Sequence, residues 1–281
     1  MAIPADIVMG MDVSDWQNPL TLDYRKLYSD ARMRVCFVKA SEGATWRARH
    51  ARSHITQASE AGMMVGLYHF ARPDLVVKND VGQADVLLDA EREATWFARQ
   101  IMSLPRTDLP HVLDLEVPAG SGVVHSNPAN IVESRGSGDG QIMLPGPERL
   151  RAWTRRFLRT LREKLPRSRR NGKAIIYVGY YFALAHLAVD ESLAAHPLWI
   201  PWYGVDQPRR VPEPWEDWQL HQYTDKWTGP GSPLGIDANR IRKSWYRRQR
   251  FIARLRQMGP FGMALAMGVL DGASGRAERA S

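Results

Sequence analysis

The sequence predicts an α/β protein built as an irregular, single-domain β/α barrel, and three observations lead to it. Apolar segments of strand length alternate with helical segments through most of the 281 residues, a pattern typical of a parallel sheet. Polar residues recur at or near the ends of the predicted strands. No glycine-rich phosphate loop follows the first strand, which argues against a doubly wound nucleotide fold. Because the strands are uneven and the later helices short, we expect an imperfect, TIM-barrel-like closure.

The elements were assigned from hydrophobic periodicity and from turn and cap residues. The predicted strands are residues 7–13, 35–40, 64–70, 111–116, 174–178, 198–203, 218–223 and, very short, 236–239. The predicted helices are residues 23–32, 50–61 and 147–165, with a long one that Asn79 or Asp80 caps and that extends to Ile101. Residues 119–146, rich in Gly, Ser, Asn and Pro, predict a long loop.

Composition narrows the classes of protein and of partner. Hydrophobic residues make up 44% of the chain, enough for a sizeable core, and the formal charge of +8 favours polyanionic partners in general. Cys36 is the only cysteine and lies in an apolar run, so we expect a buried thiol, no internal disulfide and a reducing compartment. Nothing at the N-terminus resembles a signal peptide. We therefore expect synthesis in the cytoplasm.

The segment 111–116 (HVLDLE) carries the most informative pair of residues. Side chains two apart on a strand share a face, so Asp114 and Glu116 should point the same way as Val112, with their Cα atoms roughly 6.6 Å apart. Two neighbouring carboxyl groups disfavour each other's charge. Chemistry that needs one protonated and one ionised carboxyl group uses that arrangement. Taken alone, the pair is better explained by two acids that end a strand and meet water.

Other polar residues lie in or at the ends of separate predicted strands. In a β/α barrel these ends meet at one mouth, where active sites form, so the pattern predicts an enzyme. His69 is equally compatible with a hydrogen-bonded histidine of the core, and Lys39 with Glu42 is an ion pair of either the cleft or the surface. The residues of this pattern are Asp12, Lys39, Tyr68, His69, Tyr177, Tyr203, Gln222 and Asp237.

Seven segments, in order, carry a resemblance to a known family. They are MDVSDWQ (11–17), FVKASEG (37–43), GLYHFA (66–71), DLE (114–116), LWI (198–200) with Tyr203, WQLHQYT (218–224) and GIDAN (235–239). Together they resemble glycoside hydrolase family 25, the Chalaropsis-type lysozymes common among phage endolysins. The resemblance covers about residues 7 to 240. It implies an irregular β/α barrel that hydrolyses the β-1,4 bond between N-acetylmuramic acid and N-acetylglucosamine in bacterial peptidoglycan.

Carried over residue by residue, the resemblance makes Glu116 the proton donor and Asp114 its partner, with Asp12 and Asp237 as further catalytic acids. The negative charge or nucleophile needed near the anomeric carbon would be Asp114 or Asp12 directly. Alternatively, it would be the substrate's own acetamido oxygen, with Asp114 holding the amide. No metal and no cofactor is expected, and the protein should be a monomer. The expected substrate-binding residues are Lys39, Glu42, Tyr68, His69, Tyr177, Trp199, Tyr203 and Gln222.

The chain is expected to divide into a catalytic barrel, residues 1–240, and a basic amphipathic tail, residues 241–281, for which contact with anionic wall polymer or lipid is one hypothesis. Between Arg240 and Arg256 the sequence has eight basic residues and no acid. On a helix Phe251, Ile252 and Leu255 would share a face. The simpler alternative is a last helix that packs on the barrel. A phage-encoded enzyme would act on the wall after release from the host cytoplasm.

Three other functions fit the sequence less well. A chitinase-like glycosidase would need acids at positions occupied by Leu109 and Val112. A wall-binding protein on an inactive barrel is disfavoured because all four acids are present. Nucleic-acid binding has only the basic charge in its favour, since no recognised motif accompanies it.

Overall fold

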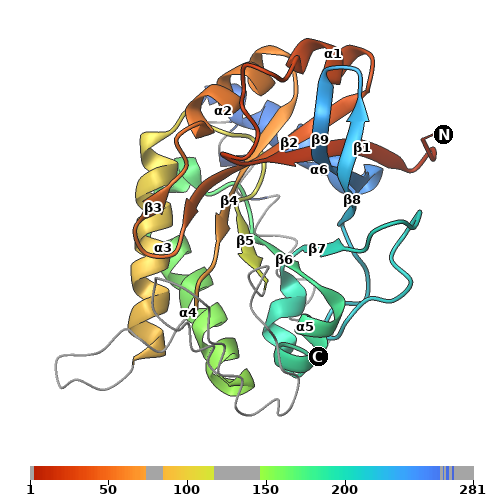
Figure 1. Cartoon of the computed structure of the whole chain (residues 1–281). Helices are drawn as coiled ribbons and strands as arrows, with labels where there is room; N and C mark the ends of the chain where they lie inside the picture. Colours follow the sequence, from red (N-terminus) through yellow and green to blue (C-terminus); the bar gives the residue numbers. More distant parts are fainter. Residues whose placement is uncertain are drawn as a thin grey trace, which may run out of the picture.

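The computed structural model describes residues 3–73, 85–116 and 146–259, with positions 262, 264, 265 and 268. Within these ranges eight strands close into a barrel, because β1 pairs with both β2 and β9 (Figure 1). The short β3 adds to the edge of β2 outside this ring. The strands are β1 (Ile7–Val13), β2 (Met33–Glu42), β3 (Trp46–Arg47), β4 (Met64–Phe70), β5 (Val112–Leu115), β6 (Ile175–Val178), β7 (Leu198–Pro201), β8 (Leu220–Gly229) and β9 (Ser232–Arg242). The predicted irregular barrel is confirmed.

The irregularity comes from the last two strands. Within the ring, all pairs among β1, β2, β4, β5, β6, β7 and β8 are parallel, whereas β9 runs antiparallel to both β8 and β1. β8 and β9 form a hairpin with no helix between them. As the second strand of this hairpin, β9 is eleven residues long. The predicted last strand, residues 236–239, was too short.

Helices cover the outside of the barrel and one of its ends. They are α1 (Tyr24–Ser29), α2 (Ala51–Glu60), α3 (Val86–Ser103), α4 (Pro147–Lys164), α5 (Tyr180–His186) and α6 (Lys243–Gln257), with the 3-10 turns η1 (Arg167–Arg169) and η2 (Glu191–Ala195). The predicted caps Asn79 and Asp80 and most of the predicted loop 119–146 lie outside the described residues. In the described part, Asp85 has extended backbone and its carboxylate accepts the N–H groups of Leu87 and Leu88, so α3 begins at Val86.

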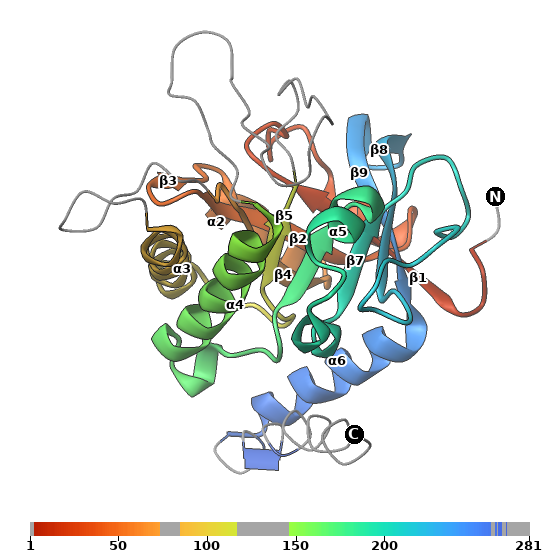
Figure 2. The ribbon, with the colours of Figure 1, turned by 90° about the horizontal axis from the view of Figure 1, so that it is seen from below.

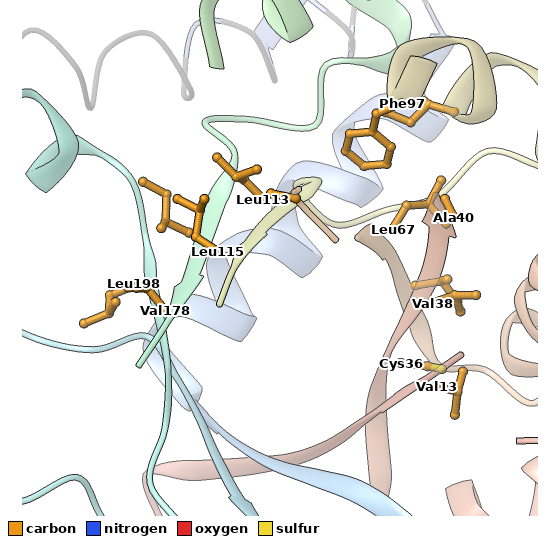
Figure 3. Close-up of a cluster of buried hydrophobic side chains, with 14 of the residues drawn as sticks. Val13, Cys36, Val38, Ala40, Leu67, Phe97, Leu113, Leu115, Val178 and Leu198 are labelled. Atoms are coloured by element: carbon orange, nitrogen blue, oxygen red, sulfur yellow. The ribbon is translucent and has the colours of Figure 1, made fainter. Parts of the chain in front are cut away.

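Alternating residues of each strand face either the barrel interior or the helices. The outward layer packs against the helices, as Figure 3 shows for Leu67 and Leu113 beside Phe97 of α3. In the inward layer a Cβ at Gly66 would lie 2.4 Å from Cε1 of Phe37, so only glycine leaves room for that ring. The inward apolar side chains are Val35, Phe37, Met64, Leu109, Val112, Ile175, Tyr177, Trp199, Leu220, Ile241 and Trp245.

Helix α6 closes the end of the barrel where the parallel strands begin. β9 runs antiparallel and delivers the chain to that end, along which Figure 2 shows α6 running. The buried residues of α6 are Trp245, Gln249 and Ile252, at helical spacing, and Trp245 joins the interior cluster. Phe251 is 54% exposed, so its predicted place on the packed face is wrong. The helix packs on the barrel, as the simpler alternative for the tail expects.

Candidate active site

A pocket of about 210 Å³ opens at the end of the barrel where the parallel strands finish. Because the strands end there together, residues far apart in the sequence share its wall. Ten of the twelve predicted site residues line it, and Glu42 and His69 do not. The other four lining residues are Ser14, Trp16, Phe70 and Val112. The lining residues are Asp12, Ser14, Trp16, Lys39, Tyr68, Phe70, Val112, Asp114, Glu116, Tyr177, Trp199, Tyr203, Gln222 and Asp237.

Asp12 and Asp237 face each other across the β1–β9 pair, where they are register partners. Burial raises the pKa of Asp12, while hydrogen bonds from Asn239 and Gln222 favour its charged form. Burial, followed by the charge of Asp12, raises the pKa of Asp237 to about 9. Asp237 therefore keeps a proton at neutral pH, and Asp12 is the member of the pair whose charged form is favoured by hydrogen bonds.

Two amide side chains hold the Asp12 carboxylate. Nδ2 of Asn239 donates to it over 2.7 Å and Nε2 of Gln222 over 3.1 Å. The carbonyl of Asn239 accepts the indole N–H of Trp199 at 2.9 Å. The carbonyl of Gln222 accepts the Tyr177 hydroxyl at 2.9 Å and the Tyr203 hydroxyl at 2.8 Å. Since both carbonyl oxygens are occupied by donors, both NH₂ groups point to Asp12.

Asn239 was not among the predicted site residues, although the sequence carries a signal for it. Asn239 lies two residues after Asp237 on β9, and side chains two apart on a strand share a face. The reasoning that joined Asp114 to Glu116 would therefore have joined Asn239 to Asp237.

Asp114 and Glu116 point into the pocket with Val112, while Leu113 and Leu115 pack outward, as the strand period predicts. Burial, with the charge of Asp12 adding to it, raises the pKa of Glu116 to about 7. Burial and the neighbouring Glu116 raise the pKa of Asp114 well above its usual range. Oδ1 of Asp114 is buried and has no hydrogen-bond partner among the described residues. It can accept a hydrogen bond from a bound molecule.

Lys39 connects the pocket to an adjoining groove. Its Nζ lies 2.6 Å from Oε2 of Glu42, which also pairs with Arg72. Although burial disfavours the charge of Glu42, the two cations hold its pKa below the usual range. Glu42 lines the groove beside Trp16 and Trp46 rather than the pocket itself. Of the two alternatives for Lys39 and Glu42, an ion pair of the cleft or of the surface, the structure shows a half-buried ion pair at the cleft.

His69 lies on the other side of the strand from the pocket. Its Nδ1 is 2.8 Å from Oγ of Ser41 and its Nε2 is 2.8 Å from Oε2 of Glu93, and the ring is fully buried. Phe97 and Phe157 stack on it, with ring centroids 5.3 and 5.1 Å away. The expected substrate contact is therefore wrong, and His69 is a hydrogen-bonded core histidine. Neighbouring residues of a strand point to opposite faces, so Tyr68 and His69 could not both face the pocket.

Known proteins resemble the chain in sequence and in fold. The family model for glycosyl hydrolases family 25 matches residues 11–232. Lysozyme M1 of Streptomyces globisporus is 27% identical over 244 residues, which cover 86% of this chain and 70% of that protein. A bacterial lysozyme from Streptomyces coelicolor superposes with a TM-score of 0.61 at 24% identity, covering 87% of this chain and 96% of that one. A family 25 lysozyme from Aspergillus fumigatus gives 0.62 at 20% identity, covering 87% and 98%. The chain belongs to glycosyl hydrolases family 25.

Proposed function

We propose that the protein is a lysozyme that hydrolyses the β-1,4 bond between N-acetylmuramic acid and N-acetylglucosamine in bacterial peptidoglycan. The observation that carries this proposal is the set of carboxyl groups at the barrel mouth. Glu116, with a pKa of about 7, lies in one pocket with Asp114 and with the amide-held Asp12. The similarity to Lysozyme M1 supports the same activity.

Glu116 is the proton donor in this proposal. A glycosidic oxygen leaves readily only if it is protonated as the bond breaks, so the donor must hold its proton near neutral pH. Burial gives Glu116 that property, and Lys39 opposes the shift. A pKa near the working pH also lets the residue take a proton from water in a later step.

Two residues can stabilise the positive charge that develops on the sugar ring. Hydrogen bonds from Asn239 and Gln222 favour the charged form of Asp12, and a fixed charge in a buried site stabilises an oxocarbenium-like transition state. Asp114 has an unpartnered oxygen that suits the N–H of an acetamido group. This arrangement therefore allows two routes, direct attack by a carboxylate and attack by the substrate's acetamido oxygen.

Aromatic side chains at the pocket supply surfaces for sugar rings. Trp16 is 93% exposed at the rim, and Tyr203 is half exposed. Trp46 lies in the adjoining groove. We propose that sugar units on either side of the cleaved bond lie against these residues, because aromatic faces pack against the apolar faces of sugars.

Digestion of purified peptidoglycan, with mass analysis of the products, tests the proposal. A muramidase leaves N-acetylmuramic acid at the new reducing ends, whereas a glucosaminidase leaves N-acetylglucosamine. Glu116→Gln should give no product while it remains folded, since an amide cannot donate the proton. Release of the other reducing sugar, or normal digestion by the folded variant, would contradict the proposal.

We also propose that the outer face of α6 contacts anionic wall polymer or lipid. Arg247, Arg250 and Arg254 are exposed beside the exposed Phe251. Exposed charge contacts weaken as salt shortens the screening length. Replacing the three arginines by glutamine should reduce binding to intact walls at low salt and leave digestion of soluble fragments unchanged. Equal binding by the variant and the parent protein would exclude this contact.

The protein is proposed to be a phage-encoded monomer, made in the cytoplasm and acting on the wall after release. The buried thiol of Cys36 is compatible with a reducing compartment. Sedimentation of the purified chain tests whether the protein is a monomer. Fractionation of producing cells before and after lysis tests the release.

A further inference from the structure

A second pocket, of about 350 Å³, lies on the outside of the barrel, away from the acids. It is bounded by the second half of α4, by residues 170–174 before β6, and by the η2 region. No residue lines both this pocket and the catalytic one. The lining residues are His111, Arg155, Leu158, Arg159, Leu161, Arg162, Leu165, Arg170, Gly172, Lys173, Ala174, Ser192, Leu193 and His196.

The wall of this outer pocket has a buried apolar part and a cationic rim. Its buried part is made of four leucines, two of them from α4 and a third, Leu165, directly after that helix. Its rim is cationic, and its lining residues include no acid. Arg155 is paired with Asp190, and Nε of Arg170 donates to the carbonyl of Leu165. Arg159 and Arg162 are exposed and form no ion pair with any residue that the structure describes.

A buried polar atom at this pocket also lacks a partner. His111 is only 4% exposed, and its Nε2 lies 3.0 Å from the carbonyl oxygen of Arg169. A carbonyl can only accept, so Nε2 carries the hydrogen and Nδ1 is left as an acceptor. Nδ1 has no hydrogen-bond partner among the described residues. A buried acceptor without a donor is costly, and a hydroxyl of a bound molecule would satisfy it.

We propose that the outer pocket binds a small anionic amphiphile, a phosphate monoester joined to an apolar chain. The phosphate would contact Arg159 and Arg162, and the chain would lie on the leucines. Near pH 6 a phosphate monoester keeps one O–H group, because its second pKa is about 6. That group can donate to Nδ1 of His111. The phosphate, its O–H group and the apolar chain thus match the two arginines, Nδ1 of His111 and the leucines.

Hexyl phosphate is a suitable probe, with inorganic phosphate and hexanol as its two halves. Each methylene that the leucines bury should strengthen binding about fourfold. Isothermal titration calorimetry at pH 6 should therefore show hexyl phosphate binding at least tenfold more tightly than either half. Equal affinity for inorganic phosphate would reduce the site to a simple anion site. Equal affinity for hexanol would reduce it to an apolar cavity. Either result overturns the proposal.

Variants test the assignment of the head group. Arg159→Gln with Arg162→Gln should weaken hexyl phosphate binding at least tenfold. Arg149→Gln makes one such exchange at an exposed position of α4 outside the pocket, and it should leave the affinity within twofold. Similar losses in both proteins would show diffuse charge attraction and would overturn the site.

Histidine ring-nitrogen NMR supplies a readout inside the pocket. Saturation with hexyl phosphate should shift the Nδ1 signal of His111 in the parent protein, and the shift should be smaller in the double arginine variant at the same ligand concentration. An unchanged signal in the saturated parent protein would overturn the proposal. None of these measurements depends on wall digestion, so they fail or succeed separately from the proposed lysozyme activity.

Discussion

Replacing Glu116 by glutamine should remove activity and, above neutral pH, make the protein more stable. Burial raises the pKa of Glu116 from 4.5 to about 7. A folded-state pKa above the unfolded value means that the folded protein binds the proton more tightly. The stability that this proton contributes is fully present below pH 4.5 and is lost as pH rises through 7. Glutamine is neutral at every pH and avoids that loss.

The size of the effect follows from the pKa shift. Each unit corresponds to about 1.36 kcal/mol, so the rise of Glu116 from 4.5 to about 7 corresponds to about 3 kcal/mol in the free energy of unfolding. Glu116→Gln should match the parent protein near pH 4 and exceed it by up to about 3 kcal/mol near pH 8. For a chain of this size that difference raises the melting temperature by about 6 °C.

Urea denaturation at pH values from 4 to 8 measures the difference, and a turbidity assay on cell walls measures activity. Glu60→Gln, at an exposed position at the end of α2, is the matched control for an exchange of glutamate for glutamine. A stability difference between the Glu116 variant and the parent protein that stays constant with pH would refute the raised pKa. Retained lysis by the folded variant would refute its role as proton donor.

Three further outcomes are expected. Asp12→Asn and Asp114→Asn should each lower turnover by about a hundredfold or more with little change in fragment binding, because they remove charge or a contact used in the transition state. Steady-state kinetics on soluble fragments measures both quantities. An unchanged kcat would make that acid structural. Asn239→Leu removes a donor to the Asp12 carboxylate, so the acid limb of the pH–rate profile should move up by about one unit; an unmoved limb would mean that Asp12 does not set it. His69→Phe leaves the carboxyl group of Glu93 without its histidine partner and should lower the free energy of unfolding by about 2 kcal/mol with kcat unchanged; a lost kcat in the folded variant would return His69 to the site.

The sequence was sufficient for residues that depend on local periodicity. The two-residue period of a strand placed Val112, Asp114 and Glu116 on one face, and the structure has them in one pocket. Asp12 was predictable at the end of the first strand because apolar residues precede it. These inferences need only the strand and its direction.

Asp237 reaches the pocket by a route that no local signal reveals. It lies in the middle of an antiparallel strand rather than at the end of a parallel one, and it meets Asp12 through a register that joins residues 225 positions apart. The prediction of the residue depended on a motif, and the predicted strand of residues 236–239 was too short to show that Asp237 lies in the middle of a long strand. The same limit applies to His69, whose partners Ser41 and Glu93 lie on other elements.

The two faces of β5 explain how a barrel can keep several buried acids at one end. Leu113 and Leu115 are fully buried against the helices, while Asp114 and Glu116 alternate with them toward the pocket. A slip of one residue in the register would exchange the two sets and place the carboxyl groups among leucines. Parallel pairing sets the register on both sides, with Asp114 opposite Phe70 of β4 and Tyr177 of β6. The apolar face therefore stabilises the strand and, through the register, determines where the acids point.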